Sequence, residues 1–174
     1  MRPVHCDENT HESATDLSKL AGAARLTSPS READLCALPW NPHPSFPGVA
    51  LKHLVTGAET DGALSAHLVR VEPGCCLQEH IHADKLELHE VVRGAGTCAL
   101  ADKTLRYEPG ACGLIPAGVP HSVRADAGET LYILAKFAPA LLKRHGQSAR
   151  ASSDCAHHQI ARPAAGLPGG PAWR

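Results

Sequence analysis

The chain has 174 residues, 43% of them hydrophobic but only 3% aromatic, so we expect one domain with a largely aliphatic core. Its formal net charge at pH 7 is −1, which provides no general attraction to nucleic acid or to an anionic membrane. It contains neither a secretory signal segment nor an apolar run near the roughly 18 residues of a membrane span, which argues against a membrane partner.

Residues 1–35 are polar and weakly patterned, and we interpret them as a weakly structured N-terminal extension, in which residues 16–26 could form a short helix. The next stretch contains four prolines within residues 39–47, which exclude a helix and a central strand. We expect it to be an extended arm that lays Trp40 and Phe46 on the core.

From residue 49 onward, short apolar or alternating runs are separated by turns, most of which contain glycine or proline. This pattern predicts strands over 49–55, 63–72, 77–82, 86–93, 97–101, 104–107, 112–115, 121–124 and 130–137. Helical patterns do not alternate with these strands, which counts against a parallel α/β sheet. We therefore predict an all-β domain over residues 36–142, built as an antiparallel barrel or jelly roll.

The last part of the chain, residues 143–174, is rich in Ala, Ser, Gly and Pro, and it is expected to be a disordered basic tail. One or two helical turns over residues 140–145 could precede it. Its positive charges are scattered, which favours a solvated tail over a nucleic-acid contact. The seven cysteines are odd in number and form no Cys-x-x-Cys pair, which favours reduced thiols and a cytoplasmic location.

Three histidines and one glutamate stand out among the turns and strands. His80 and His82 are two residues apart, so in a strand their side chains point to the same face. Glu87 follows a short polar turn, and His121 opens another apolar run. If they converge, three imidazoles and one carboxylate make a site for a divalent metal. The alternative is that these histidines only fill the interior of the barrel.

These residues resemble the two sequence motifs of the cupin superfamily. The first motif is G, five residues, H-x-H, three or four residues, E, six residues, G, and its positions are matched by Gly74, His80, His82, Glu87 and Gly94. The second is G, five residues, P-x-G, two residues, H, three residues, N, and it is matched by Gly110, Pro116, Gly118 and His121, with Ala125 in place of the Asn.

The resemblance covers residues 49–137 and implies a jelly-roll β-barrel with flexible N- and C-terminal extensions. It also implies a metal inside the mouth of the barrel, held by His80, His82, Glu87 and His121. Their ligand types suit Fe, Mn, Ni, Co or Zn, and do not choose among these ions. Because cupins commonly pair, the resemblance further implies a possible homodimer.

His89 lies two residues beyond Glu87, so strand alternation points it to the same interior face. Several cupin lyases place a tyrosine at this offset as a base. The imidazole of His89, with an ordinary pKa of about 6.5, suits acid–base catalysis near neutrality. The alternative is that His89 only hydrogen-bonds a metal ligand.

We therefore expect a metal-dependent enzyme that acts on a small oxygen-rich or carboxylated substrate. A dioxygenase (an oxidoreductase) and a redox-neutral lyase or isomerase both fit these residues. The other class is a non-catalytic cupin that senses or binds a ligand. Residues 1–35 are too short and too weakly patterned to supply the helix-turn-helix domain that a sensor often carries.

Overall fold

The computed structural model describes residues 25–29 and 31–141, and within these residues the chain forms strands and no helix. All strand pairs are antiparallel, so the predicted all-β class is confirmed. Since the described part of the chain contains no helix, it has none that is long and apolar enough to cross a membrane.

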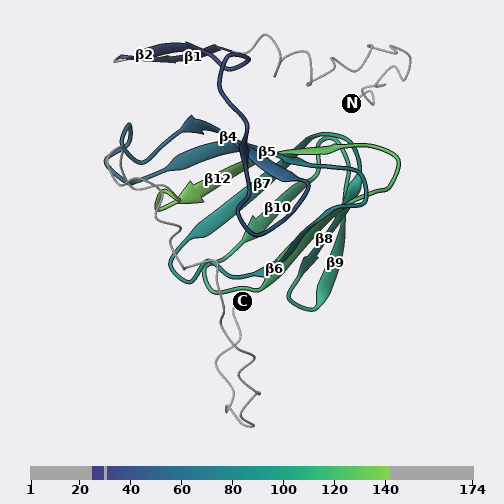
Figure 1. The fold of residues 1–174 in the computed structure, drawn as a ribbon. Coiled ribbons are helices and arrows are strands. Elements are labelled where there is room, and N and C mark those ends of the chain that lie inside the picture. The colour runs from purple at the N-terminus through teal and green to yellow at the C-terminus, as the bar shows by residue number, and fades with distance from the viewer. Residues whose placement is uncertain (1–24, 30, 142–174) are drawn as a thin grey trace, which may run out of the picture.

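Two sheets form the barrel (Figure 1). The larger has six strands in the order β10-β7-β12-β5-β4-β3. Their bounds are β3 Asn41–Pro42, β4 Val49–Val55, β5 Ser65–Val71, β7 Leu86–Arg93, β10 Cys112–Ile115 and β12 Leu131–Ala138. The smaller has four strands in the order β6-β11-β8-β9. These are β6 Cys76–His80, β8 Gly96–Leu100, β9 Lys103–Tyr107 and β11 His121–Ala125.

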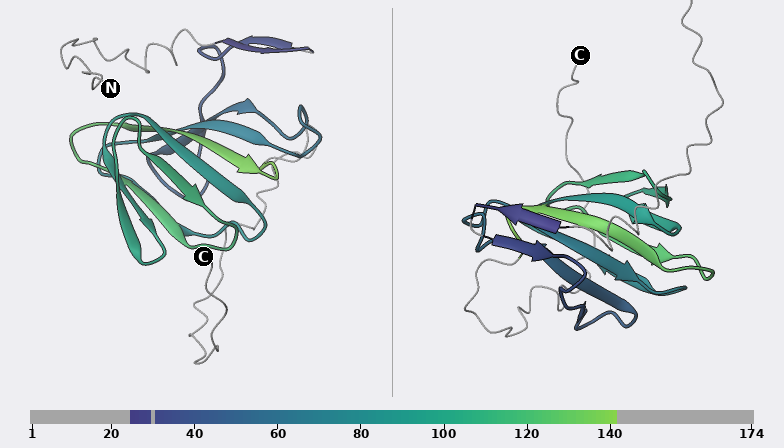
Figure 2. Two further views of the ribbon diagram at one scale, coloured as in Figure 1. Left: turned by 180° about the vertical axis from the view of Figure 1, so that it is seen from behind. Right: turned by 90° about the horizontal axis from the view of Figure 1, so that it is seen from above.

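The two sheets face each other, as Figure 2 shows from behind and from above. Side chains alternate between a buried and a more exposed face along β5 and β12, and this alternation is what the sequence pattern predicted. The buried side chains fill the space between the sheets with the mostly aliphatic core expected from the composition. Its members are Phe46, Val49, Val69, Val71, Leu77, Val91, Cys98, Tyr107, Val123, Ala125, Leu131, Ile133, Ala135 and Phe137.

All nine predicted strands are present, and each begins and ends within two residues of its predicted bounds. The difference that matters for the site is at β6, which ends at His80 instead of continuing to His82. Strand β6 is paired with β11 only as far as His80, opposite His121. His82 therefore lies in the loop that follows the strand.

A short hairpin precedes the barrel, in a region for which no strand was predicted. Its strands are β1 Arg25–Ser28 and β2 Arg31–Asp34, and they form a separate two-stranded sheet (Figure 1). The Oγ atom of Ser28 accepts a hydrogen bond from the backbone N–H of Arg31 at 3.0 Å. The Arg31 guanidinium joins the hairpin to the barrel through the Leu54 carbonyl and the Glu59 carboxylate, both at 2.8 Å. The predicted extension thus has regular structure at its end.

The proline-rich arm follows the hairpin and adds β3 to the edge of the larger sheet. Phe46 is buried in the core, as predicted. Trp40 was expected on the core too, but it lies half-buried on the outer face of the sheet. Its ring stands 4.7 Å from the Arg70 guanidinium and 5.2 Å from the Lys52 ammonium. These cations, whose residues alternate with core residues along β4 and β5, therefore hold Trp40 by cation–π contacts.

The last described residues lie beside β5. Ala140 is fully buried, and the backbone N–H of Leu141 donates to the Oγ atom of Ser65 at 2.8 Å. Neither Ala140 nor Leu141 is helical. The remainder of the helical turns expected over 140–145, the tail from 143 and most of the helix expected over 16–26 lie outside the described residues, and Arg25 and Leu26 belong to β1.

Candidate metal centre

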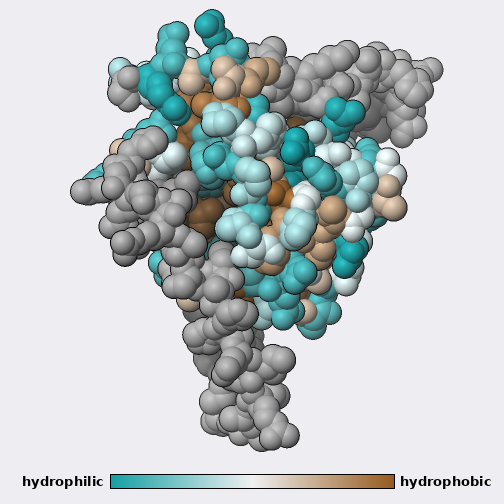
Figure 3. All heavy atoms as spheres, in the orientation of Figure 1, coloured by the Kyte–Doolittle hydropathy of each residue, from teal (hydrophilic) through white to brown (hydrophobic). Residues whose placement is uncertain are grey.

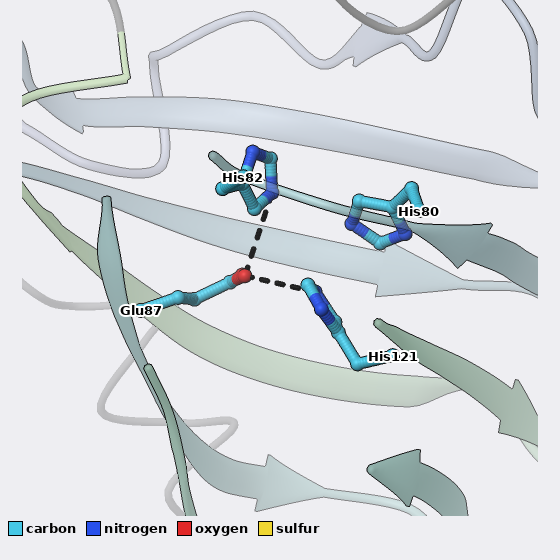
Figure 4. A group of neighbouring side chains, drawn as sticks. All are labelled: His80, His82, Glu87 and His121. Atoms are coloured by element: carbon cyan, nitrogen blue, oxygen red, sulfur yellow. Dashed lines mark ion pairs between the residues drawn. The ribbon is translucent and has the colours of Figure 1, made fainter. Parts of the chain in front are cut away.

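The structure brings together all four residues that the sequence analysis selected as metal ligands. One nitrogen each from His80, His82 and His121 and one oxygen from Glu87 lie within 4.8 Å of one another. Figure 4 shows the side chains pointing toward a common point from different elements of the chain. Glu87 and His121 are buried, and the other two are half-buried.

Strand pairing places His80 and His121 beside each other. They are direct partners across β6 and β11, and their ring centroids are 4.2 Å apart. The Nδ1 atom of His80 lies 2.8 Å from the Gln78 carbonyl, and that of His121 lies 3.1 Å from the Val119 carbonyl. Because a carbonyl only accepts, each Nδ1 carries the proton, and each Nε2 has its lone pair available for a metal.

His82 reaches the site from the loop after β6. Its carbonyl accepts a hydrogen bond from the backbone N–H of Gly118 at 2.9 Å. Gly118 has a φ of +77°, a conformation that glycine adopts without steric cost, and it lies in the turn that leads into His121. A backbone hydrogen bond thus joins the two motifs next to the ligands.

Glu87 comes from the other sheet. On β7 it is paired with Ile115 of β10 and with Phe137 of β12, and it is only 2% exposed. Its Oε2 atom lies 3.0 Å from Nε2 of His121 and 3.5 Å from Nε2 of His82 (Figure 4, dashed lines). The carboxylate therefore faces the ring nitrogens across the interior.

The electrostatics favour neutral imidazoles beside an ionised carboxylate. Burial, together with the neighbouring His121, lowers the pKa of His80 to about 4, and burial also lowers the pKa of His82. Burial alone would raise the pKa of Glu87, but the close approach of His121 and the hydrogen bond from His89 hold it well below its usual range. These are the protonation states in which such side chains bind metals.

Two buried atoms of the cluster have no hydrogen-bond partner among the described residues: Oε2 of Glu87 and Nε2 of His121. They are 3.0 Å apart, but their arrangement is not that of a hydrogen bond. Buried polar atoms are rarely left unpaired, because the lost hydrogen bond costs roughly 1–3 kcal/mol. A divalent cation between them would satisfy both atoms, so these residues fit a metal.

His89 lies in the interior beside Glu87, as alternation predicted, and only 2% of its surface is exposed. Its Nε2 atom is 2.6 Å from Oε1 of Glu87, and its Nδ1 atom is 3.0 Å from the Tyr107 hydroxyl. Both ring nitrogens therefore have partners within the protein. A role in acid–base catalysis stays a prediction.

A second pair of interior histidines was missed by the sequence analysis. Nδ1 of His53 on β4 lies 3.0 Å from Nδ1 of His67 on β5, and Nε2 of His67 lies 2.9 Å from Oγ of Ser65. The alternation of β5 provided the signal, because Ser65 and His67 occupy the same face as the buried Val69 and Val71.

Aromatic rings lie close to the histidines of the site. Phe137 packs against His82 with ring centroids 5.2 Å apart, and Phe46 lies 6.1 Å from His80. Next to the ligands in the chain, Ile81 and Leu86 are 46% and 43% exposed. Figure 3 shows hydrophobic residues at several places on the visible face, between mostly hydrophilic ones.

Comparison with known proteins agrees with the fold that the two motifs imply. Residues 67–136 match the family model described as "Cupin domain". No curated protein matched the sequence.

Solved structures with the same fold include a cupin 2 conserved barrel domain protein from Rhodopseudomonas palustris, which is 23% identical, with a TM-score of 0.55 over 67% of this chain and 80% of that one. The polyketide cyclase RemF from Streptomyces resistomycificus is 19% identical, with a TM-score of 0.56 over 62% and 78%. A predicted oxalate decarboxylase from Thermotoga maritima is 19% identical, with a TM-score of 0.54 over 59% and 94%.

The family match begins within β5 and ends within β12, so it includes both motifs and all four clustered side chains. The larger and smaller sheets together supply these side chains, as a jelly-roll barrel with an interior site requires. Over residues 67–136 the barrel of this chain therefore matches the cupin domain family, and its fold is that of a cupin barrel.

Proposed function

We propose that this protein is a metal-dependent enzyme that acts on a small oxygen-rich or carboxylated molecule. His80, His82, Glu87 and His121 would hold a divalent cation, and the ligand types are compatible with Fe, Mn, Ni, Co or Zn. The observation that carries the proposal is the pair of buried, unpaired atoms on Glu87 and His121, which face each other inside the cluster.

When bound, such an ion supplies a Lewis acid that polarises an oxygen of the substrate, and a redox-active ion adds electron transfer. The four protein ligands would hold the ion, and the substrate or water would take any position that they leave open. Other groups of the chain shield and orient the ligands. Phe137 and Phe46 shield the imidazoles from water, and the Gln78 and Val119 carbonyls fix the orientation of two rings.

The names of two structural relatives guide the choice of substrate class. One is described as a predicted oxalate decarboxylase, and the other as a polyketide cyclase. Oxalate is a dicarboxylate and polyketides are rich in oxygen, and both kinds of molecule offer oxygen ligands to a hard cation. A panel of small dicarboxylates, hydroxy acids and β-dicarbonyl compounds therefore covers the proposed class.

The test combines elemental analysis with turnover assays. Protein purified without chelators is expected to carry close to one divalent ion per chain, and the Glu87→Gln variant to carry little. With the substrate panel, oxygen uptake identifies a dioxygenase, while product formation without oxygen uptake identifies a lyase or isomerase. Saturable binding without turnover would contradict an enzyme and favour a ligand-sensing cupin. Protein that retains no ion and binds none on titration would contradict the metal centre.

Two further expectations from the sequence stay predictions: the cytoplasmic location and the pairing of two copies. An uncovered sheet edge offers unpaired backbone groups to another chain, which is the physical reason to expect a homodimer. Light scattering at micromolar concentration decides this point, since a dimer has twice the mass of the 18.3 kDa chain.

A further inference from the structure

Three buried side chains form a line that ends on the carboxylate of the candidate metal centre. The Tyr107 hydroxyl lies 3.0 Å from Nδ1 of His89, and Nε2 of His89 lies 2.6 Å from Oε1 of Glu87. None of the three is more than 2% exposed. They come from β9 and β7, and the line lies on the side of Glu87 away from Oε2.

The chemistry of the groups fixes the direction of both hydrogen bonds. An ionised carboxylate can only accept, so Nε2 of His89 carries a proton and donates it to Oε1 of Glu87. In a neutral imidazole, Nδ1 then accepts, and the Tyr107 hydroxyl donates to it. Burial, and after it the Cys98 thiol, raises the pKa of Tyr107 well above its ordinary value, so that hydroxyl keeps its proton.

A glycine on the neighbouring strand leaves space for the Tyr107 hydroxyl in this line. Gly113 on β10 is the direct strand partner of His89. A Cβ atom at position 113 would overlap the Tyr107 hydroxyl. The absence of a side chain at Gly113 therefore lets the hydroxyl approach His89, which a larger residue would prevent.

We propose that His89 is a positioning residue that acts through Glu87. Its hydrogen bond occupies Oε1, so that Oε2 alone is presented to the ring nitrogens of His82 and His121. Tyr107 supports this by holding His89 in the tautomer that donates from Nε2. The proposal rests on the proposed metal centre, and it assigns His89 a different role from the acid–base catalysis expected from the sequence.

Energetically, the line has two effects on a metal-binding carboxylate. It restricts the rotation of the carboxylate before any ion arrives, and so lowers the entropy cost of binding. It also limits Glu87 to coordination through one oxygen. Removing such an outer hydrogen bond typically weakens metal affinity by about 10- to 100-fold.

The test measures Co²⁺ affinity and the Co²⁺ absorption spectrum of wild-type protein and three variants. His89→Leu removes the donor, and its affinity is expected to fall by about 10- to 100-fold. His89→Gln places an amide N–H near the position of Nε2, so it should recover most of the affinity and the wild-type spectrum. Tyr107→Phe keeps the aromatic ring but removes the hydroxyl that holds His89 in one tautomer. Its loss of Co²⁺ affinity should be smaller than that of His89→Leu.

A matched control is His67→Leu, which removes another buried histidine whose ring nitrogens contact His53 and Ser65 and not Glu87. Its Co²⁺ affinity should stay near the wild-type value. Circular dichroism and thermal unfolding of the metal-free proteins separate loss of stability from loss of affinity. If His89→Leu does not fold, the comparison of His89→Gln and Tyr107→Phe with wild type carries the test.

Three results would overturn the proposal. Unchanged Co²⁺ affinity and spectrum in folded His89→Leu would do so, and if turnover were also lost, the acid–base role would be supported. A loss of Co²⁺ affinity in His89→Gln as large as that in His89→Leu would show that the affinity does not depend on a donor at the position of Nε2. Wild-type protein that binds no Co²⁺ would overturn the metal centre as well, which distinguishes failure of that site from failure of His89 alone.

Discussion

The Nδ1 atoms of His53 and His67 face each other at 3.0 Å inside the barrel, and a hydrogen bond between them can hold only one proton. Nε2 of His67 has its own partner in Ser65 Oγ. Since His67 is fully buried, adding a proton to its neutral ring brings an unscreened charge into the interior. The pair therefore makes the fold sensitive to acid.

We expect the free energy of unfolding of the metal-free protein to fall between about pH 6.5 and 4. Burial, and after it His53, lowers the pKa of His67 to about 4, whereas the unfolded chain binds that proton near 6.5. The unfolded state thus takes up the proton first as the pH falls, and the full shift corresponds to roughly 3 kcal/mol. Urea unfolding of chelator-treated protein at pH 7 and pH 5 measures the loss.

The control for this pH effect is His67→Leu. The variant keeps the other histidines whose pKa values are lowered by burial, including His43 and His80, so some acid sensitivity should remain. Its loss of stability from pH 7 to pH 5 should nevertheless be smaller than that of wild type. Equal losses in the two proteins would contradict a role for His67.

Glu87→Gln tests the carboxylate of the metal centre with little change in shape. We expect Co²⁺ affinity to fall by at least roughly 100-fold, since loss of an outer partner alone typically costs 10- to 100-fold. The reason is that the substitution removes the single negative charge of the cluster. Competition with a chelator measures the affinity, and binding as tight as wild type would show that Glu87 is not a ligand.

Adding a divalent metal is expected to stabilise the protein. At a free metal concentration 100 times the Kd, the gain is about 2.7 kcal/mol, which raises Tm on the order of 10 °C for a domain of this size. Differential scanning calorimetry with and without Zn²⁺ measures the shift, and EDTA should reverse it. The His121→Gln variant is the control, and an equal shift in that variant would indicate binding elsewhere.

Gly113→Ala tests the space that the Tyr107 hydroxyl occupies. The added Cβ would overlap that hydroxyl, so we expect a destabilisation of about 1–3 kcal/mol together with weaker Co²⁺ binding. Gly128→Ala is the matched control, because a Cβ there meets nothing within 4 Å and should change neither property. Urea unfolding and chelator competition measure the two effects. If Gly113→Ala changed neither the stability nor the Co²⁺ affinity, Tyr107 would be able to move aside without a cost in free energy.

Much of the barrel could be predicted because its strands carry a local signal. The alternation of buried and exposed residues along β5 and β12 is visible in the sequence, and most of the turns between the strands of the barrel contain glycine or proline. The hairpin of β1 and β2 has no such signal, since its residues are mostly polar and it is held by the contacts of Ser28 and Arg31.

The four clustered ligands were found because their spacing is local within each motif. His89 was found too, but the contacts of Tyr107 and of the His53–His67 pair were not, because they depend on how distant strands meet. Tyr107 approaches His89 from β9 past Gly113 of β10, and His53 meets His67 only through the register of β4 and β5. His82 also shows the limit of strand reasoning, since it converges on the site although β6 has ended.

The ligands of the candidate centre are divided between the two sheets: His80 and His121 belong to the smaller one, and Glu87 to the larger. A cation bound by all of them would be a cross-link between the halves of the barrel. Resistance to proteolytic cleavage should then increase with metal occupancy, so that an emptied protein would also be the one removed most rapidly by proteases.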